Sequence, residues 1–240
     1  AGTGSGSFGY SGGGSPKNSR INRIDYSNDT TVTTPVGNLS STRAYLTGAV
    51  SGQESGLNVA GTPITPATRT ESGTPSPVGP NYGYYGAGSG NGSNPRSWVD
   101  RIDFDNDTAT SSPKGNLAGE FEFGGGSSSI PYGYFVGGTS TPRQSYINRI
   151  DYANDTATAS NVGNLTEART NAIGTHNSSY GYHAGGYNGS NANTTIVDRI
   201  DYSSDSGTAT PKGNLDLAVG SPTGVSLSLI HISEPTRQLQ

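Results

Sequence analysis

The chain has 240 residues, a formal net charge of −4, and a composition that is 29% hydrophobic, with 37 glycines, 14 prolines and no cysteine. The acidic balance provides no basic surface for a phosphate backbone, so nucleic acid is not an expected partner. No apolar run reaches the roughly 18 residues of a membrane helix, so we expect no membrane insertion. Low-complexity chains have similar compositions, but many of the 14 tyrosines recur at fixed positions of a repeat, which favours a folded, turn-rich all-β protein.

One segment occurs four times along the chain, as Arg23-Ile24-Asp25-Tyr26, Arg101-Ile102-Asp103-Phe104, Arg149-Ile150-Asp151-Tyr152 and Arg199-Ile200-Asp201-Tyr202. Each copy is followed by Gly-Asn-Leu, with the glycine 14 residues after the arginine, at Gly37, Gly115, Gly163 and Gly213. A self-similar period predicts one supersecondary unit that buries its apolar face against its neighbours. The arginines lie 78, 48 and 50 residues apart.

An aromatic-Gly-aromatic strand is predicted in every unit, in chain order at Phe8-Gly9-Tyr10, Tyr82-Gly83-Tyr84, Tyr132-Gly133-Tyr134 and Tyr180-Gly181-Tyr182. In the last unit, strands are predicted near 168–174, 180–186, 196–202 and 207–210. Four short strands in about 50 residues are the pattern of a propeller blade. We predict four full repeats and one degenerate repeat, at about 41–80, within an array spanning 1–224.

The third strand of each unit alternates apolar and charged residues. Ile150 and Tyr152 should share one face, and Arg149 and Asp151 the other. We expect the charged face to form a structural Arg–Asp ladder between adjacent sheets, because a buried charge needs a partner; a repeated ligand site is the alternative. The ladder would comprise Arg23, Asp25, Arg101, Asp103, Arg149, Asp151, Arg199 and Asp201.

The order of these segments resembles the kelch repeat: an apolar strand, an aromatic strand ending in glycines, a variable loop, an apolar-Asp-aromatic strand and a closing strand. The resemblance covers residues 1 to about 224 and implies a kelch-like β-propeller, although the kelch tryptophan of the last strand is absent. The wording Arg-Ile-Asp-Tyr-x-Asn-Asp-Thr also resembles repeats of marine phage and environmental-virus structural proteins. The segment 225–240 breaks the repeat and resembles a translated sequencing adapter, so we expect a non-native or disordered tail; a genuine C-terminal strand is the alternative.

The start inside a repeat and the lack of methionine suggest a fragment of a longer chain. The chain begins at a second strand and leaves, near 217–220, at what would be a first strand. These ends are therefore predicted to pair within one blade and close the ring.

Candidate binding residues lie where the repeats differ. The loops at 15–20, 91–97, 139–145 and 187–195 vary while the strands do not, and a rigid frame with variable loops is how scaffolds present binding residues. Trp, Tyr and Arg are common anchors of binding sites. The tentative site residues are Trp98, Arg143, Tyr146 and Tyr187; alternatively, Trp98 and Tyr146 simply begin the third strand and pack between blades.

No catalytic, metal or cofactor motif stands out. Asp103-Phe104-Asp105-Asn106-Asp107 resembles the head of a calcium loop, but Thr108 and Lys114 occupy the positions of the required glycine and glutamate. Turn formation explains these residues better. We therefore expect no enzyme activity and no cofactor.

These patterns favour a non-enzymatic binding or structural module, an adhesin-like component of a virion or cell surface that recognises protein or glycan. A cellular kelch-type interaction scaffold is the alternative, and a propeller glycosidase or lyase a distant third. A virion or extracellular location is favoured, and the oligomeric state is left open.

Overall fold

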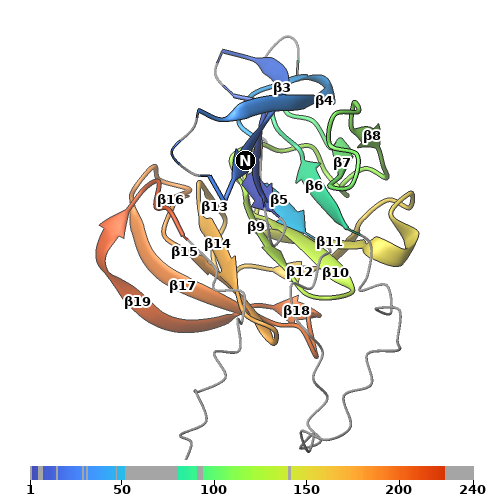
Figure 1. Cartoon of the computed structure of the whole chain (residues 1–240). Helices are drawn as coiled ribbons and strands as arrows, with labels where there is room; N and C mark the ends of the chain where they lie inside the picture. Colours follow the sequence, from blue (N-terminus) through green and yellow to red (C-terminus); the bar gives the residue numbers. More distant parts are fainter. Residues whose placement is uncertain are drawn as a thin grey trace, which may run out of the picture.

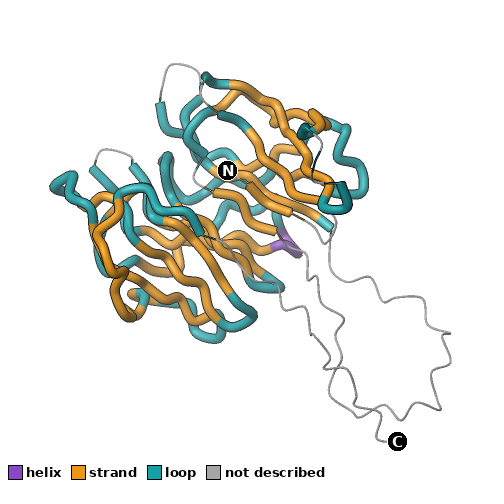
Figure 2. Tube along the Cα trace, turned by 60° about the vertical axis from the view of Figure 1, so that its left-hand side comes forward, coloured by secondary structure: helices purple, strands orange, loops and turns teal. Residues whose placement is uncertain are grey.

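The computed structural model describes residues 2–224 apart from 5–7, 15, 29, 31, 47, 52–80, 91–93 and 140–141. Among these residues the chain is built from strands, and the single helical element is one 3-10 turn, η3 (Tyr152–Asn154). Figure 2 shows this turn as the one purple segment among orange strands. The prediction of an all-β protein is confirmed.

The strands form four main sheets, each antiparallel and in chain order, and no sheet closes on itself (Figure 1). Sheet 1 comprises β1 (Gly2–Gly4), β2 (Phe8–Gly12), β3 (Asn18–Asp25) and β4 (Thr34–Arg43). Sheet 2 comprises β5 (Gly48–Ser51), β6 (Tyr82–Gly86), β7 (Val99–Asp103) and β8 (Ser112–Pro113). Sheet 3 comprises β9 (Gly125–Ser128), β10 (Tyr132–Val136), β11 (Tyr146–Asp151) and β12 (Ser160–Asn164). Sheet 4 comprises β14 (Ile173–His176), β15 (Tyr180–Ala184), β17 (Thr194–Asp201) and β19 (Thr210–Val219).

Two short pairings connect sheets 3 and 4. Strand β18 (Gly207–Thr208) adds to the edge of sheet 3 by pairing parallel to β12, although it follows β17 in the chain. Strand β13 (Arg169–Thr170) pairs with β16 (Tyr187–Asn188) as a separate two-stranded sheet. The segment that follows sheet 3 and the loop inside sheet 4 are thereby tied together.

The aromatic-Gly-aromatic strand pairs with the Arg-Ile-Asp strand in one register throughout. The glycine lies opposite the isoleucine in all four sheets, as Gly9↔Ile24, Gly83↔Ile102, Gly133↔Ile150 and Gly181↔Ile200. A Cβ at Gly133 would come within 2.8 Å of the Tyr152 hydroxyl, and one at Gly181 within 2.8 Å of the Tyr202 hydroxyl. The glycine therefore makes room for the aromatic residue of its own sheet.

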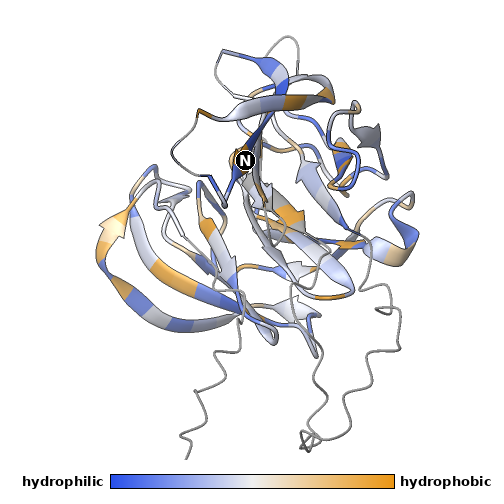
Figure 3. Cartoon of the chain, in the orientation of Figure 1, coloured by the Kyte–Doolittle hydropathy of each residue, from blue (hydrophilic) through white to orange (hydrophobic). Residues whose placement is uncertain are grey.

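The apolar core lies between successive sheets. One tyrosine of each aromatic strand stacks on the aromatic residue after Arg-Ile-Asp in the next sheet: Tyr10 on Phe104 (4.8 Å between centroids), Tyr84 on Tyr152 (5.1 Å) and Tyr134 on Tyr202 (5.0 Å). Figure 3 shows both hydrophobic and hydrophilic residues along β17. Because stacked aromatic pairs lie on both sides of sheets 2 and 3, both faces of an interior sheet are used for packing.

Two boundary predictions can be compared with the structure. Of the predicted degenerate repeat, 41–43 end β4 and 48–51 form β5 of sheet 2, while 52–80 lie outside the described residues. The predicted pairing of the chain's ends is wrong, because β1 pairs with β2 in sheet 1 whereas residues 217–219 belong to β19, which pairs with β17. Over the residues the structure describes, no helix is long and apolar enough to cross a membrane.

Candidate functional site

Where two successive sheets meet, an arginine of the earlier sheet pairs with an aspartate of the following repeat. Arg101 Nη1 donates to Asp155 Oδ2 at 2.7 Å, and the Tyr84 hydroxyl donates to the same oxygen at 3.0 Å. The same group recurs as Arg23, Tyr10 and Asp107, and as Arg149, Tyr134 and Asp205. Burial, and then the neighbouring carboxylate, raise the pKa of Tyr84. These groups hold adjacent sheets together by charge-assisted hydrogen bonds.

The aspartates of the Arg-Ile-Asp strings do not pair with these arginines, so the predicted ladder is corrected. Asp151 Oδ1 accepts a hydrogen bond from the backbone nitrogen of Ala153 at 2.9 Å. Asp25, Asp103 and Asp201 likewise accept from the backbone two residues on, at Ser27, Asp105 and Ser203. They start the turn after the strand.

The true partner is the aspartate six residues after the arginine of the next repeat. Asp107, Asp155 and Asp205 occupy this position, as does Asp29, which lies outside the described residues. The recurrence was visible in the sequence as part of the repeated Asn-Asp wording. Its role was not, because the pair joins two different repeats. Asp107, which belongs to the segment that resembles a calcium loop, accepts hydrogen bonds from Arg23 and Tyr10.

A second, fully buried ion pair was missed from the sequence. Arg43 donates to Asp100 and Arg169 to Asp198, and all four side chains have 0% exposure. Each arginine follows Gly-Asn-Leu, and each aspartate precedes Arg-Ile-Asp. Between sheets 2 and 3 the same two positions hold Phe121 and Asn148, both with 0% exposure. The charged pair is therefore exchanged as a unit for an apolar and an amide residue.

Close backbone approach explains the Gly-Asn-Leu glycine. A Cβ at Gly37, Gly115 or Gly163 would overlap backbone oxygen of the next repeat, that of Ala109, Ala157 or Gly207. The following asparagine carbonyl accepts from that repeat, for example Asn116 O from the Ala159 nitrogen at 2.8 Å. The glycine is an inter-sheet contact rather than a turn residue.

Two of the four candidate binding residues are engaged within the fold. Arg143 donates from Nη1 to the Asn188 carbonyl and from Nη2 to Asn191 Oδ1 at 2.5 Å. Tyr187 pairs with Thr170, and its ring leaves no room for a Cβ at Gly220. Arg143 therefore stabilises the 187–191 loop by hydrogen bonds, and Tyr187, the first residue of this loop, is held by strand pairing and packing.

Trp98 and Tyr146 occupy equivalent positions, three residues before the repeated arginine of sheets 2 and 3. Their side chains are 38% and 40% exposed. The backbone of each is engaged, because the Trp98 carbonyl accepts from Ala87 and the Tyr146 carbonyl from Gly137. Tyr146 begins β11 and Trp98 directly precedes β7, close to what the alternative interpretation held, but both side chains are partly exposed.

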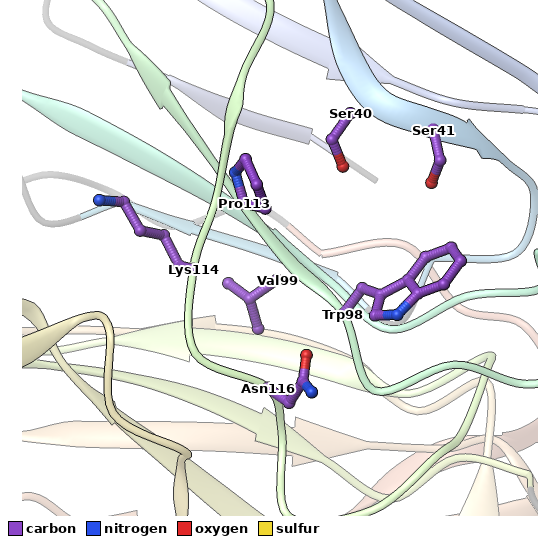
Figure 4. A pocket seen from close by; sticks show the side chains of 7 residues that line it. All are labelled: Ser40, Ser41, Trp98, Val99, Pro113, Lys114 and Asn116. Atoms are coloured by element: carbon purple, nitrogen blue, oxygen red, sulfur yellow. The ribbon is translucent and has the colours of Figure 1, made fainter.

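Of these four residues, Trp98 lines a cavity between two sheets. The cavity has a volume of about 200 Å³ and is formed by Ser40, Ser41, Trp98, Val99, Pro113, Lys114 and Asn116. Figure 4 shows the two serine side chains on one side of the space and the Asn116 carboxamide on the other. The lysine ammonium is directed away and lies 3.3 Å from Asp155.

The cavity combines an aromatic ring with neutral hydrogen-bonding groups. The Arg96 guanidinium lies over the Trp98 ring, 5.1 Å from its centroid. Ser41 Oγ is buried without a hydrogen-bond partner among the described residues. Asp, Glu and His are absent from the described lining, so the arrangement suits binding better than acid–base chemistry.

Comparisons with known proteins support the fold alone. No protein-family model matches the chain, and no curated protein matches it either. A solved structure described as "Structure of YjhT" is similar with a TM-score of 0.64 at 11% sequence identity, over 90% of this chain. The match spans 65% of the YjhT chain. At this identity, YjhT shows what this chain resembles in architecture.

Proposed function

We propose that this chain is a kelch-like β-propeller array that binds a glycan in the cavity beside Trp98 and does not transform it chemically. The main observation behind this proposal is the indole of Trp98, which is 38% exposed and lines the cavity together with two serines and an asparagine.

The propeller assignment is supported by four similar four-stranded sheets that follow one another in the chain. Sheets 2 and 3 each use one face against the preceding sheet and the other against the following sheet, as blades do. The unit of about 50 residues has kelch length. The likeness to YjhT, at a TM-score of 0.64, is in keeping with this assignment.

A glycan fits the chemistry of the cavity. The flat apolar side of a sugar ring stacks on an aromatic face, while its hydroxyl groups exchange hydrogen bonds with hydroxyls and amides. Ser40, which is exposed and lines the cavity, offers such a bond through its hydroxyl, and Asn116 offers both a donor and an acceptor. A glycosidase needs two carboxyl groups flanking the sugar bond, and the described lining contains none.

The setting that we propose is a virion or cell surface, where the module would act as an adhesin. The resemblance of its repeat wording to marine phage structural proteins supports this setting. Tail or baseplate genes beside the source gene would support the virion, whereas their absence beside a cellular operon would favour an intracellular interaction scaffold.

Trp98 is the single tryptophan of the chain, so its fluorescence reports directly on the cavity. A glycan array should identify a ligand, and titration with that glycan should change the emission saturably without releasing a cleaved product. Trp98→Ala should abolish capture on the array. Tyr146→Ala, which removes the equivalent exposed aromatic residue of sheet 3, should leave capture unchanged. Equal loss in both variants, or capture that leaves Trp98 emission unaltered, would refute this site, and product release would refute the non-enzymatic role.

A further inference from the structure

The residue three positions after the Gly-Asn-Leu glycine meets the next sheet in the same way in all three contacts between sheets. This position holds Ser40, Ala118 and Thr166. The backbone nitrogen of each donates to the side chain that directly precedes the repeated arginine of the next sheet: to Asp100 Oδ2 at 3.2 Å, Asn148 Oδ1 at 2.8 Å and Asp198 Oδ2 at 3.3 Å. The backbone therefore places the three residues alike against the next sheet.

The side chains at this position differ although the backbones agree. Thr166 Oγ1 donates to Asp198 Oδ1 at 2.7 Å, so that both oxygens of this buried carboxylate have a partner. Asp100 is equally buried, with 0% exposure, but its Oδ1 has no partner among the described residues. The Ser40 side chain lines the Trp98 cavity instead, and Figure 4 shows its hydroxyl directed into the open space.

Rotation of one side chain would complete the hydrogen bonds of Asp100. A buried acceptor without a donor destabilises the fold. Serine χ1 has three staggered positions, and the Ser40 backbone already has the hydrogen bond from which Thr166 reaches its aspartate. Thr166 stays exposed while it makes that bond. A hydroxyl at this position can therefore donate inward and keep an oxygen lone pair available to accept.

We propose that Ser40 determines which group of the sugar the cavity recognises, by donating its own proton to Asp100 Oδ1 and accepting a hydrogen bond from a free sugar hydroxyl. This inference rests on the proposed glycan-binding function. The charged acceptor at the end of this chain of hydrogen bonds polarises the Ser40 hydroxyl and strengthens its oxygen as an acceptor. Ser40 is thus a contact residue of the sugar, and Asp100 is a positioning residue.

The other two contacts each lack a part of this arrangement. The position three residues before the repeated arginine holds Trp98 in sheet 2, Tyr146 in sheet 3 and Ile196 in sheet 4. In the contact between sheets 2 and 3 the residue equivalent to Ser40 is Ala118, which has no hydroxyl. In the contact between sheets 3 and 4 the Thr166 hydroxyl is already bound to Asp198, and Ile196 supplies no aromatic ring. The contact between sheets 1 and 2 combines an aromatic ring with a hydroxyl that is directed into a cavity.

Sugar derivatives test the direction of the hydrogen bond. The probes are the methyl glycosides of glucose, galactose, mannose and N-acetylglucosamine, titrated against the emission of Trp98. The strongest binder is then compared with its deoxy and deoxyfluoro derivatives at each hydroxyl group, because fluorine can accept a hydrogen bond but cannot donate one. At one position of the sugar we expect both derivatives to bind about tenfold or more weakly than the parent glycoside. Deoxyfluoro derivatives that bind as well as the parent at every position overturn the proposal.

Substitutions at residue 40 test whether Ser40 is the acceptor. Ser40→Ala should bind the parent glycoside about tenfold more weakly and should no longer distinguish it from the derivatives at the sensitive position. Ser40→Thr copies Thr166 and should bind within about threefold of the wild type; a loss equal to that of Ser40→Ala overturns inward donation. Thr166→Ala is the matched control, since it removes the equivalent hydroxyl outside the cavity and should leave binding unchanged.

A double variant should reverse the preference. Arg43→Phe with Asp100→Asn copies Phe121 and Asn148, whose Nδ2 has no partner among the described residues. The new carboxamide should donate from Nδ2 to Ser40 Oγ, so that the Ser40 hydroxyl donates to the sugar. The deoxyfluoro derivative should then bind better than the deoxy derivative. Equal binding of the two overturns the role of Asp100.

The outcomes separate this inference from the function on which it rests. If Ser40→Ala binds the parent glycoside like the wild type while Trp98→Ala does not bind it, the role of Ser40 is refuted and the glycan site stands. If none of the four glycosides changes the emission of the wild-type chain, the glycan site and the role of Ser40 are refuted together. Circular dichroism confirms that each variant is folded.

Discussion

Arg169 and Asp198 form an ion pair in which Nη2 donates to Oδ2 at 2.7 Å while both side chains are fully buried. The carboxylate also accepts from the Thr166 hydroxyl at 2.7 Å. Burial lowers the pKa of Arg169 because it penalises the charged guanidinium, and its Nε and Nη1 have no partner among the described residues. The pair thus links the end of sheet 3 to sheet 4 at a substantial desolvation cost.

Removing one member of this pair should be severe. Asp198→Ala leaves a buried guanidinium without its counter-charge, and we expect a loss of about 3–5 kcal/mol in the free energy of unfolding, measured by urea denaturation. The double variant Arg169→Phe with Asp198→Asn copies the Phe121 and Asn148 pair of the previous contact and should recover most of that loss. A double variant as unstable as the single one would show that the two contacts are not interchangeable.

The Gly-Asn-Leu glycines should respond to a methyl group according to their place in the series. Gly163→Ala puts a Cβ against the Gly207 carbonyl and should cost about 1–3 kcal/mol or more, as overpacking does. Gly213→Ala meets no described neighbour and should change stability by less than about 0.5 kcal/mol. Thermal unfolding at low protein concentration compares the two. Equal effects would contradict the inter-sheet role of the glycine.

Two aspartates four residues apart should differ in importance. Asp155→Ala leaves Arg101 and the Tyr84 hydroxyl without their shared acceptor and should cost about 2–5 kcal/mol. Asp151→Ala removes only the bond to the Ala153 nitrogen, a loss of about 1 kcal/mol by analogy with helix caps. Both are read from denaturant midpoints with unchanged slopes. If Asp151→Ala proved the more damaging, the ladder would consist of the Arg-Ile-Asp aspartates after all.

His183 should make stability depend on pH on the acid side of neutrality. It is fully buried, its Nε2 lies 3.1 Å from the Ser127 hydroxyl, and burial, with Arg169 and His176 nearby, lowers its pKa from 6.5 to about 3. Between these values the unfolded chain binds the proton and the folded chain does not. Stability should therefore fall as pH is lowered from about 6.5 towards 3, by about 1.4 kcal/mol per pH unit at most from this group.

His183→Phe isolates this contribution, since Phe135 occupies the equivalent position in sheet 3 with 0% exposure. The difference in unfolding free energy between the wild type and the variant should shrink or reverse in favour of the variant as pH falls through this window. A difference that stays constant from pH 7 to 4 would show that His183 takes up its proton within the fold.

The four repeated strings could be read from the sequence because they are local, whereas the register of the paired strands is a finding of the structure. The Tyr-Gly-Tyr and Arg-Ile-Asp strands pair within one unit, and period-2 alternation separates Ile150 and Tyr152 from Arg149. Trp98 could likewise be identified as a candidate from its residue type and its place beside the variable loop 91–97. Its cavity could not, because Ser40 and Ser41 come from β4 of another sheet.

The sequence by itself determined an all-β chain of four similar units, because strand periodicity and glycine placement are properties of neighbouring residues. Only the tertiary structure decided which charges pair. Arg101 meets Asp155 and not Asp103, since the strand directs the arginine to the next sheet while the aspartate caps its own turn. The tertiary structure also decided that Arg143 and Tyr187 make contacts within the fold. Among the described residues, Arg199 has no acidic partner and Tyr26 is largely exposed. Contacts between repeats depend on how the repeats pack against one another. The sequence of one repeat, being nearly the same in each copy, does not show which residues of another repeat it will contact.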